Sequence, residues 1–100
     1  MNNVIFDKYV DEVCNLFSIK KEELFSKVRT KHVVEARQMV FYLCYNRPMG
    51  LNLIKSYTLS SGLNIAHTSI LHGIRSIGHK RSVSRDYDSA INRIERTVTI

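Results

Sequence analysis

One short stretch of the chain gathers side chains that could make specific hydrogen bonds. His67, Thr68 and Ser69 stand together, and His72 and Arg75 follow at helical spacing. None of these side chains is acidic, and each can donate or accept a hydrogen bond. Such a surface fits the major groove of DNA, where base edges present donors, acceptors and the thymine methyl group. It equally fits an exposed helix whose polar face is only solvated.

The residues around this polar set predict an α-helix over residues 64–78. Ile70, Ile74 and Ile77 recur at i, i+4 and i+7, which places them on one apolar face. Asn64 is a candidate N-cap, because its side-chain oxygen could accept a hydrogen bond from an unpaired amide of the first turn. We therefore expect the isoleucines to pack inward and the polar residues to face outward.

The balance of charge favours an anionic partner. The chain of 100 residues has 15 Lys and Arg against 9 Asp and Glu, a formal net charge of +6. A basic segment with Lys27, Arg29 and Lys31 precedes Arg37 and Gln38. Basic residues gathered on one surface are typical of binding to phosphate groups. A charged, solvated connector would have the same composition.

The sequence lacks the residues that several classes of protein function require. The histidines and cysteines show no metal-ligand spacing, and no nucleophile has a base and an orienting group near it, so we expect neither a metal site nor catalytic residues. The phosphate-binding motif Gly-x-x-x-x-Gly-Lys-Ser/Thr is absent, so we expect no nucleotide and no other cofactor. No apolar run is long enough to cross a bilayer, and no signal peptide is evident, which predicts a cytoplasmic protein with reduced cysteines.

The remaining pattern predicts a single all-α domain over residues 1–100. Glycine (4) and proline (1) are scarce, and 44% of the residues are hydrophobic, as in a globular protein. Residues 27–32 are predicted to form a basic loop, and residues 79–84 a polar connector whose Ser84 caps the last helix. Apolar periodicity predicts six helices, over residues 4–17, 20–26, 33–46, 51–58, 64–78 and 85–98.

Two of these helices form a candidate helix-turn-helix. The helix over residues 51–58 is followed by a connecting segment, residues 59–63, and then by the helix with the polar front. In a DNA-binding helix-turn-helix the second helix reads the major groove. The connecting segment here is longer than the usual tight turn.

Two separate motifs stand out between residues 10 and 77. The first comprises Glu22-Glu23-Leu24, a basic segment that opens with Ser26-Lys27, and the run Val33-Val34-Glu35-Ala36-Arg37-Gln38. The second is His67-Thr68-Ser69 followed by Ile70-Leu71-His72. In this order the two motifs resemble the DNA-binding C-terminal domain of the bacterial replication initiator DnaA, and together they are more specific than either motif alone. The resemblance implies a TrpR-like, all-α helix-turn-helix bundle that binds double-stranded DNA.

The resemblance also implies roles for single residues. In that family the recognition helix, here residues 64–78, lies in the major groove, and the basic loop, here residues 27–31, reaches the adjacent minor groove. His67, Thr68 and Ser69 would then contact base edges or a thymine methyl group. Arg29 would enter the minor groove, whose negative potential suits arginine. The residues implied to hold the phosphate backbone are Lys27, Lys31, Arg37 and Gln38. For His72 and Arg75, further along the helix, contact with the backbone, contact with a base and no contact all stay open.

Two features depart from the family pattern. Ala66 stands where the family has an aspartate, which could accept a hydrogen bond from a cytosine amino group, so discrimination at that base should be relaxed. Residues 60–65 replace the family's short Gly-Gly-Arg-Asp turn, so the recognition helix could approach DNA at a different angle. A further alternative concerns Arg37, which could pair with an acidic neighbour such as Glu23 instead of a phosphate.

Two hypotheses for the function follow. The first is a sequence-specific double-stranded DNA-binding protein, the DNA-binding domain standing alone, that acts in transcription regulation or DNA replication control in a bacterium, encoded there or by a phage. The second is a protein-interaction module of the same fold that binds a host initiator or polymerase, which Ala66 and the long turn favour. The target site and the oligomeric state stay open, a homodimer included.

Overall fold

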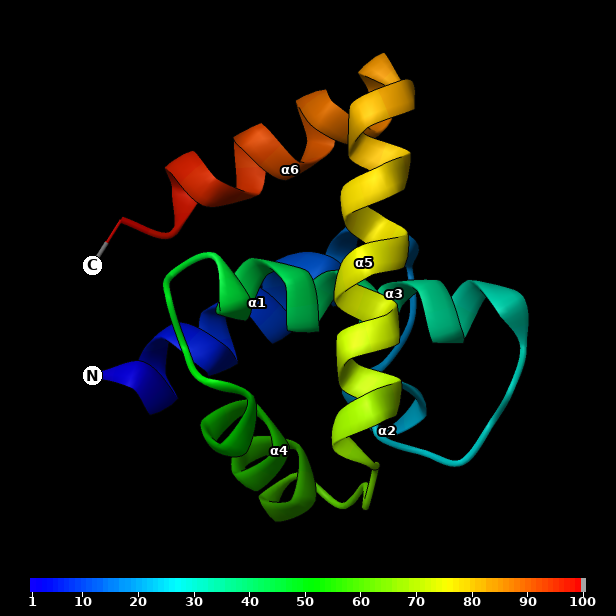
Figure 1. Ribbon diagram of the computed structural model, residues 1–100, viewed down its shortest axis with the longest axis vertical. Coiled ribbons are helices and arrows are strands. Elements are labelled where there is room, and N and C mark those ends of the chain that lie inside the picture. The colour runs from blue at the N-terminus through cyan, green and yellow to red at the C-terminus, as the bar shows by residue number, and fades with distance from the viewer. Residues whose placement is uncertain (100) are drawn as a thin grey trace.

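The computed structural model describes residues 1–99, which form a bundle of α-helices without a β-strand (Figure 1). This architecture confirms the predicted all-helical fold. The helices, in chain order, are α1 (Asn2–Phe17), α2 (Lys21–Leu24), α3 (Lys31–Tyr45), α4 (Leu51–Ser60), α5 (His67–Val83) and α6 (Arg85–Thr97).

Helix α3 lies at the centre of the bundle. Helix α1 packs along it, and α5 crosses it on another side (Figure 1). A helix that is apolar nearly all round is stable only when most of its sides are covered. The other helices are therefore placed by their packing against α3, whose buried apolar residues are Val33, Ala36, Met39, Val40, Phe41, Leu43 and Cys44.

Helices α3 and α5 approach each other closely at Gly73. A Cβ atom added at this glycine would lie 2.8 Å from Cγ and 3.2 Å from Cβ of Gln38, too near to fit unless Gln38 or the backbone beside it shifts. Ile70, Ile74 and Ile77 are buried beside this contact, as predicted. The absence of a side chain at Gly73 thus sets how close α5 lies to α3, and with it where the polar face of α5 stands.

Helix α5 begins later than its sequence pattern predicts. The predicted N-cap, Asn64, does not cap the helix, because the chain stays extended through Ala66 and the helix starts at His67. Ala66 occupies the cap position without a side-chain hydrogen bond. The side-chain oxygen of Asn64 instead lies 3.5 Å from the Lys55 ammonium of α4.

Helix α5 also ends later than predicted. The expected polar connector, residues 79–84, is helical up to Val83, so Ser84 alone separates α5 from α6. Ser84 caps α6 as predicted, since its hydroxyl accepts a hydrogen bond from the Tyr87 amide at 3.3 Å. The segment is polar, and the side chains that it contacts belong to another helix. Its own sequence therefore did not predict that it is helical.

Those partners converge on Arg81. Its guanidinium donates to Asp88 at 2.8 Å, to Asn92 at 2.6 Å and to Glu95 at 3.2 Å, all on α6. It also donates to the Tyr42 hydroxyl of α3 at 3.2 Å. The two carboxylates stabilise the guanidinium and raise its pKa, chiefly through the hydrogen bond to Asp88. Arg81 therefore joins α3, α5 and α6.

Candidate DNA interface

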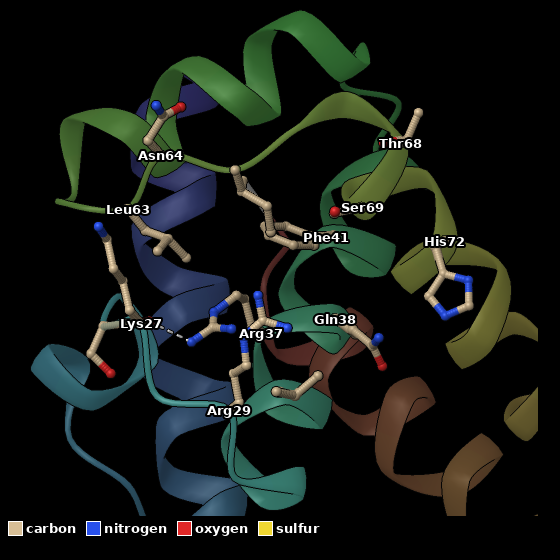
Figure 2. A pocket seen from close by; sticks show the side chains of 13 residues that line it. Lys27, Arg29, Arg37, Gln38, Phe41, Leu63, Asn64, Thr68, Ser69 and His72 are labelled. Atoms are coloured by element: carbon tan, nitrogen blue, oxygen red, sulfur yellow. Dashed lines mark hydrogen bonds between the residues drawn. The ribbon is translucent and has the colours of Figure 1, made fainter.

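A groove brings the basic loop and the first turns of α5 together. Figure 2 shows Lys27 and Arg29 on one side, from the loop between α2 and α3, and Thr68 and His72 of α5 on the other. The groove encloses about 710 Å³. It is lined by Ser26, Lys27, Arg29, Val34, Arg37, Gln38, Phe41, Leu63, Asn64, Ile65, Thr68, Ser69 and His72.

Most of the residues predicted to contact DNA present exposed side chains. The structure brings the loop and helix members together, although about forty residues separate them in the chain. Gln38 is half-buried in the groove, where it packs against Gly73. The exposed members of the predicted set are Lys27, Arg29, Lys31, His67, Thr68, Ser69, His72 and Arg75.

Three members of the predicted set lie outside the groove lining. Lys31 opens α3, and Arg75 lies one turn beyond His72 on α5. His67 faces a second hollow, which it shares with Tyr45 of α3 and with the start of α4. His67 and Thr68, although adjacent in sequence, therefore border different hollows.

Arg37 is turned inward instead of toward solvent. The residue is 8% exposed, its Nε donates to the Leu24 carbonyl at 2.9 Å, and its Nη2 donates to the carbonyls of Ser26 at 2.8 Å and Val28 at 3.5 Å. Burial lowers the pKa of the guanidinium, yet arginine keeps its charge in proteins. The guanidinium therefore bonds to main-chain carbonyls and not to Glu23, the alternative partner that the sequence offered, while the phosphate contact predicted for Arg37 stays a prediction. Sequence spacing could not reveal these bonds, because the acceptors are main-chain carbonyls.

No acidic side chain lines the groove. Residues 24–34, which include the basic loop, and residues 36–85, which include α5 up to Val83, contain no Asp or Glu, and this pattern is visible in the sequence. The resulting separation of charge leaves a positive potential on the groove side, which attracts a polyanion. Much of the acidic charge lies instead on α1 and α2, in Asp7, Asp11, Glu12, Glu22 and Glu23.

Within residues 1–99, no group of three or more His, Cys, Asp and Glu side chains could hold a metal ion. In the same part of the chain, no helix has the length and apolar character that crossing a membrane requires. The groove is a surface on which exposed basic and polar side chains from separate elements lie together.

Similarity to known proteins agrees with this geometry. A family model described as the helix-turn-helix of the bacterial dnaA protein matches residues 6–77. The chain belongs to this family. The matched residues run from α1 into α5 and include both sides of the groove, so the resemblance seen in the sequence is confirmed.

Curated relatives of this DnaA helix-turn-helix domain are chromosomal replication initiator proteins DnaA. The protein of Aquifex aeolicus (strain VF5) is 28% identical over 87 residues, and that of Pseudothermotoga lettingae is 31% identical over 94 residues. These matches cover 87% and 93% of this chain but 21% and 20% of the two relatives. The chain therefore spans about a fifth of the length of these relatives.

A solved structure described as a DNA replication initiation factor has the same fold. It superposes with a TM-score of 0.76 over 97% of this chain and 29% of the other, at 23% sequence identity. The likeness extends the agreement beyond the matched family residues to the arrangement of the whole helical bundle. The predicted helix-turn-helix bundle is thereby confirmed.

The turn of this DnaA-type helix-turn-helix depends on two residues that the sequence did not single out. Lys55 of α4 donates to the Ile65 carbonyl and so ties the irregular segment before α5 to α4. Gly62 has a φ of 114°, a conformation that favours glycine. The glycine was visible in the sequence, but no pattern predicts the Lys55 contact, because its acceptor is a backbone carbonyl.

Proposed function

We propose that this chain binds double-stranded DNA with a preference for sequence, through the groove between the basic loop and α5. The observation that carries the proposal is the meeting of exposed Lys27 and Arg29 with exposed Thr68, Ser69 and His72 on one surface without acidic residues. Phosphate contacts supply most of the affinity in such complexes, and contacts to base edges supply the preference.

In the proposed complex the first turn of α5 lies in the major groove. His67, Thr68 and Ser69 are exposed there, and the first turn has neither an acidic residue nor a side-chain cap. Its free amides and hydroxyl groups can donate to phosphates and to base acceptors. Arg29 enters the adjacent minor groove, and Lys27 and Lys31 contact phosphates.

The names of the relatives favour DNA replication over transcription as the process in which this chain acts. Both relatives described above are named chromosomal replication initiator proteins. We therefore propose DNA replication control, by occupation of initiator-type sites, ahead of transcription regulation.

The decisive experiment is fluorescence anisotropy of this chain with a random-library duplex at about 50 mM and about 200 mM salt. Binding is expected at the lower salt and should weaken steeply at the higher salt, because counterions are released when basic residues contact phosphates. Sequences enriched by selection would then reveal the target. If the chain bound no duplex at low salt, the proposal would be rejected, and the alternative of a protein-interaction module would be favoured.

The phosphate contacts can be tested singly. Lys27→Ala and Lys31→Ala should each weaken binding to every duplex and reduce the salt slope of log K by about 1. Lys8→Ala, at an exposed lysine of α1, is the matched control and should leave the slope unchanged. An unchanged slope in both loop variants would contradict the placement of the loop on the DNA backbone.

A further inference from the structure

We propose that Arg37 is a positioning residue, which holds the basic loop in its DNA-binding shape without touching DNA. This inference rests on the proposed function, because it assigns a role within the same groove. It differs from the phosphate contact implied by the family resemblance. The basis is the inward guanidinium and the three main-chain carbonyls to which it donates.

The three carbonyls mark the path of the loop. The Leu24 carbonyl closes α2, and the last carbonyls of a helix lack partners within the helix. The Ser26 and Val28 carbonyls belong to the irregular chain that follows. A single side chain from the central helix α3 therefore fixes the end of α2 and two points of the loop.

The loop has few hydrogen bonds of its own. The Ser26 hydroxyl donates to the Glu23 carbonyl at 2.7 Å and accepts from the Val28 amide at 3.3 Å. Both bonds are local and neither connects the loop to α3. At the end of the loop the Thr30 carbonyl accepts from the Val34 amide of α3 at 2.9 Å. Earlier in the loop the connections to α3 come from Arg37, so the shape of residues 24–28 depends on this side chain.

Arginine suits this task because its planar guanidinium presents several N–H donors in fixed directions. Lysine carries the same charge, but on a single ammonium nitrogen with a flexible stem. One nitrogen cannot reproduce bonds that leave Arg37 from two different atoms, Nε and Nη2. The exchange of Arg37 for lysine thus separates the geometry of the side chain from its charge.

The fixed loop places the charges that face DNA. Lys27 lies between the Ser26 and Val28 acceptors, and Arg29 follows directly; both side chains are exposed at the groove (Figure 2). A loop ordered before binding avoids the entropy cost of being ordered on DNA. Without Arg37, the loop would keep its charges but lose their placement.

The first test compares Arg37→Lys with Arg93→Lys, the same change at an exposed arginine of α6 outside the groove. Anisotropy with the selected duplex should show binding weakened roughly tenfold by Arg37→Lys, comparable with the loss of one good groove contact. Arg93→Lys should bind as the wild type does. Unchanged binding by Arg37→Lys would overturn the proposal, because lysine can replace arginine at a simple phosphate contact.

A double-mutant cycle with Arg29→Ala tests whether Arg37 acts through the loop. If Arg37 places Arg29, the loss caused by Arg37→Lys should become much smaller once Arg29 is absent, whereas independent contacts would give additive losses. Additive losses would overturn the proposal. A loss of folding alone would appear equally in both backgrounds and in urea denaturation.

A measurement on the free wild-type protein needs neither DNA nor a variant. The Nε–H proton of Arg37 should give an NMR signal protected from exchange with water, since it is buried and donates to the Leu24 carbonyl. Rapid exchange of this proton would overturn the positioning role whatever the DNA result. A protected proton in a protein that binds no duplex would instead show that the proposed function, and with it the role in DNA binding, has failed.

Discussion

At the scale of single residues, His67 and Thr68 carry the discrimination in the proposed complex. Both are exposed at the start of α5 and border different hollows, so each is expected to read a different base or backbone position. Alanine at either position should cost about 1–3 kcal/mol on the preferred duplex and much less on a scrambled one. Competition anisotropy with the two duplexes measures this difference.

The control for these variants is Ser89→Ala, which removes an exposed hydroxyl group from α6. It should leave both affinities unchanged. Equal losses on the preferred and the scrambled duplex would refute base reading by the residue concerned.

Ala66 offers a prediction about stability at the same scale. Its φ of −74° and ψ of 150° are those of an N-cap residue, but alanine has no side chain that could accept from the first turn. Ala66→Asn should therefore raise the free energy of unfolding by about 0.5–2 kcal/mol in urea denaturation. Ala66→Val, which adds a side chain without an acceptor, should show no such gain. Equal stability of the two variants would argue against capping.

At the scale of elements, the position of α5 depends on its close approach to α3. Gly73→Ala would force Cβ against Gln38, and overpacking of this kind costs about 1–3 kcal/mol, more than alanine gains over glycine in a helix. We expect lower stability in urea denaturation and weaker DNA binding, because the polar face of α5 must move.

Gly78 provides the matched control on the same helix. A Cβ atom there would lie 3.5 Å from Cε1 of Tyr42, an ordinary contact. Gly78→Ala should therefore stabilise the protein by up to about 1 kcal/mol through helix propensity. If Gly73→Ala were stabilising as well, the close crossing would not limit the approach of the helices.

At the scale of the whole molecule, Glu35 ties three helices together. From α3 it accepts a hydrogen bond from the Tyr87 hydroxyl of α6, and it pairs with the Lys80 ammonium of α5 at 3.3 Å. Burial by itself raises the pKa of Glu35, but the Tyr87 hydrogen bond and the Lys80 charge outweigh it, so the net pKa lies below the ordinary value of 4.5.

This pKa shift predicts a pH-dependent effect of Glu35→Gln. A carboxyl group whose pKa is lower in the folded than in the unfolded state stabilises the fold above the unfolded value. The stabilisation is lost as the pH falls through the folded pKa. Near neutral pH the variant should be less stable by about 1 kcal/mol, a modest figure because the pair is partly exposed.

Urea denaturation at neutral pH and near pH 3, on either side of the ordinary pKa range of carboxyl groups, would show whether the stabilities of the two proteins converge in acid. Asp7→Asn, at an exposed position of α1, is the control for the removal of a carboxylate and should change stability little. A stability difference that stays constant between the two pH values would contradict the ionic role of Glu35.

The sequence by itself determined the helical fold and identified most of the exposed basic and polar residues of the candidate site. Apolar periodicity is a local property, so Ile70, Ile74 and Ile77 revealed the buried face of α5 without knowledge of its neighbours. The charge and hydrogen-bonding character of Lys27, Arg29 and Thr68 are likewise properties of residue type. The resemblance to the family then assigned the basic loop and α5 to one DNA-binding surface.

Only the tertiary structure decided what depends on partners distant in sequence. Arg37 and Lys55 donate to backbone carbonyls, whose positions are set by the packing of irregular segments and leave no mark in residue spacing. Helix α5 continues past residue 78 to Val83, where Arg81 contacts Asp88 of α6, a partner that residue spacing within α5 does not reveal. Local pattern therefore identified the groups that could meet DNA, whereas the packing around α3 determined which of them face the groove and which hold it in shape.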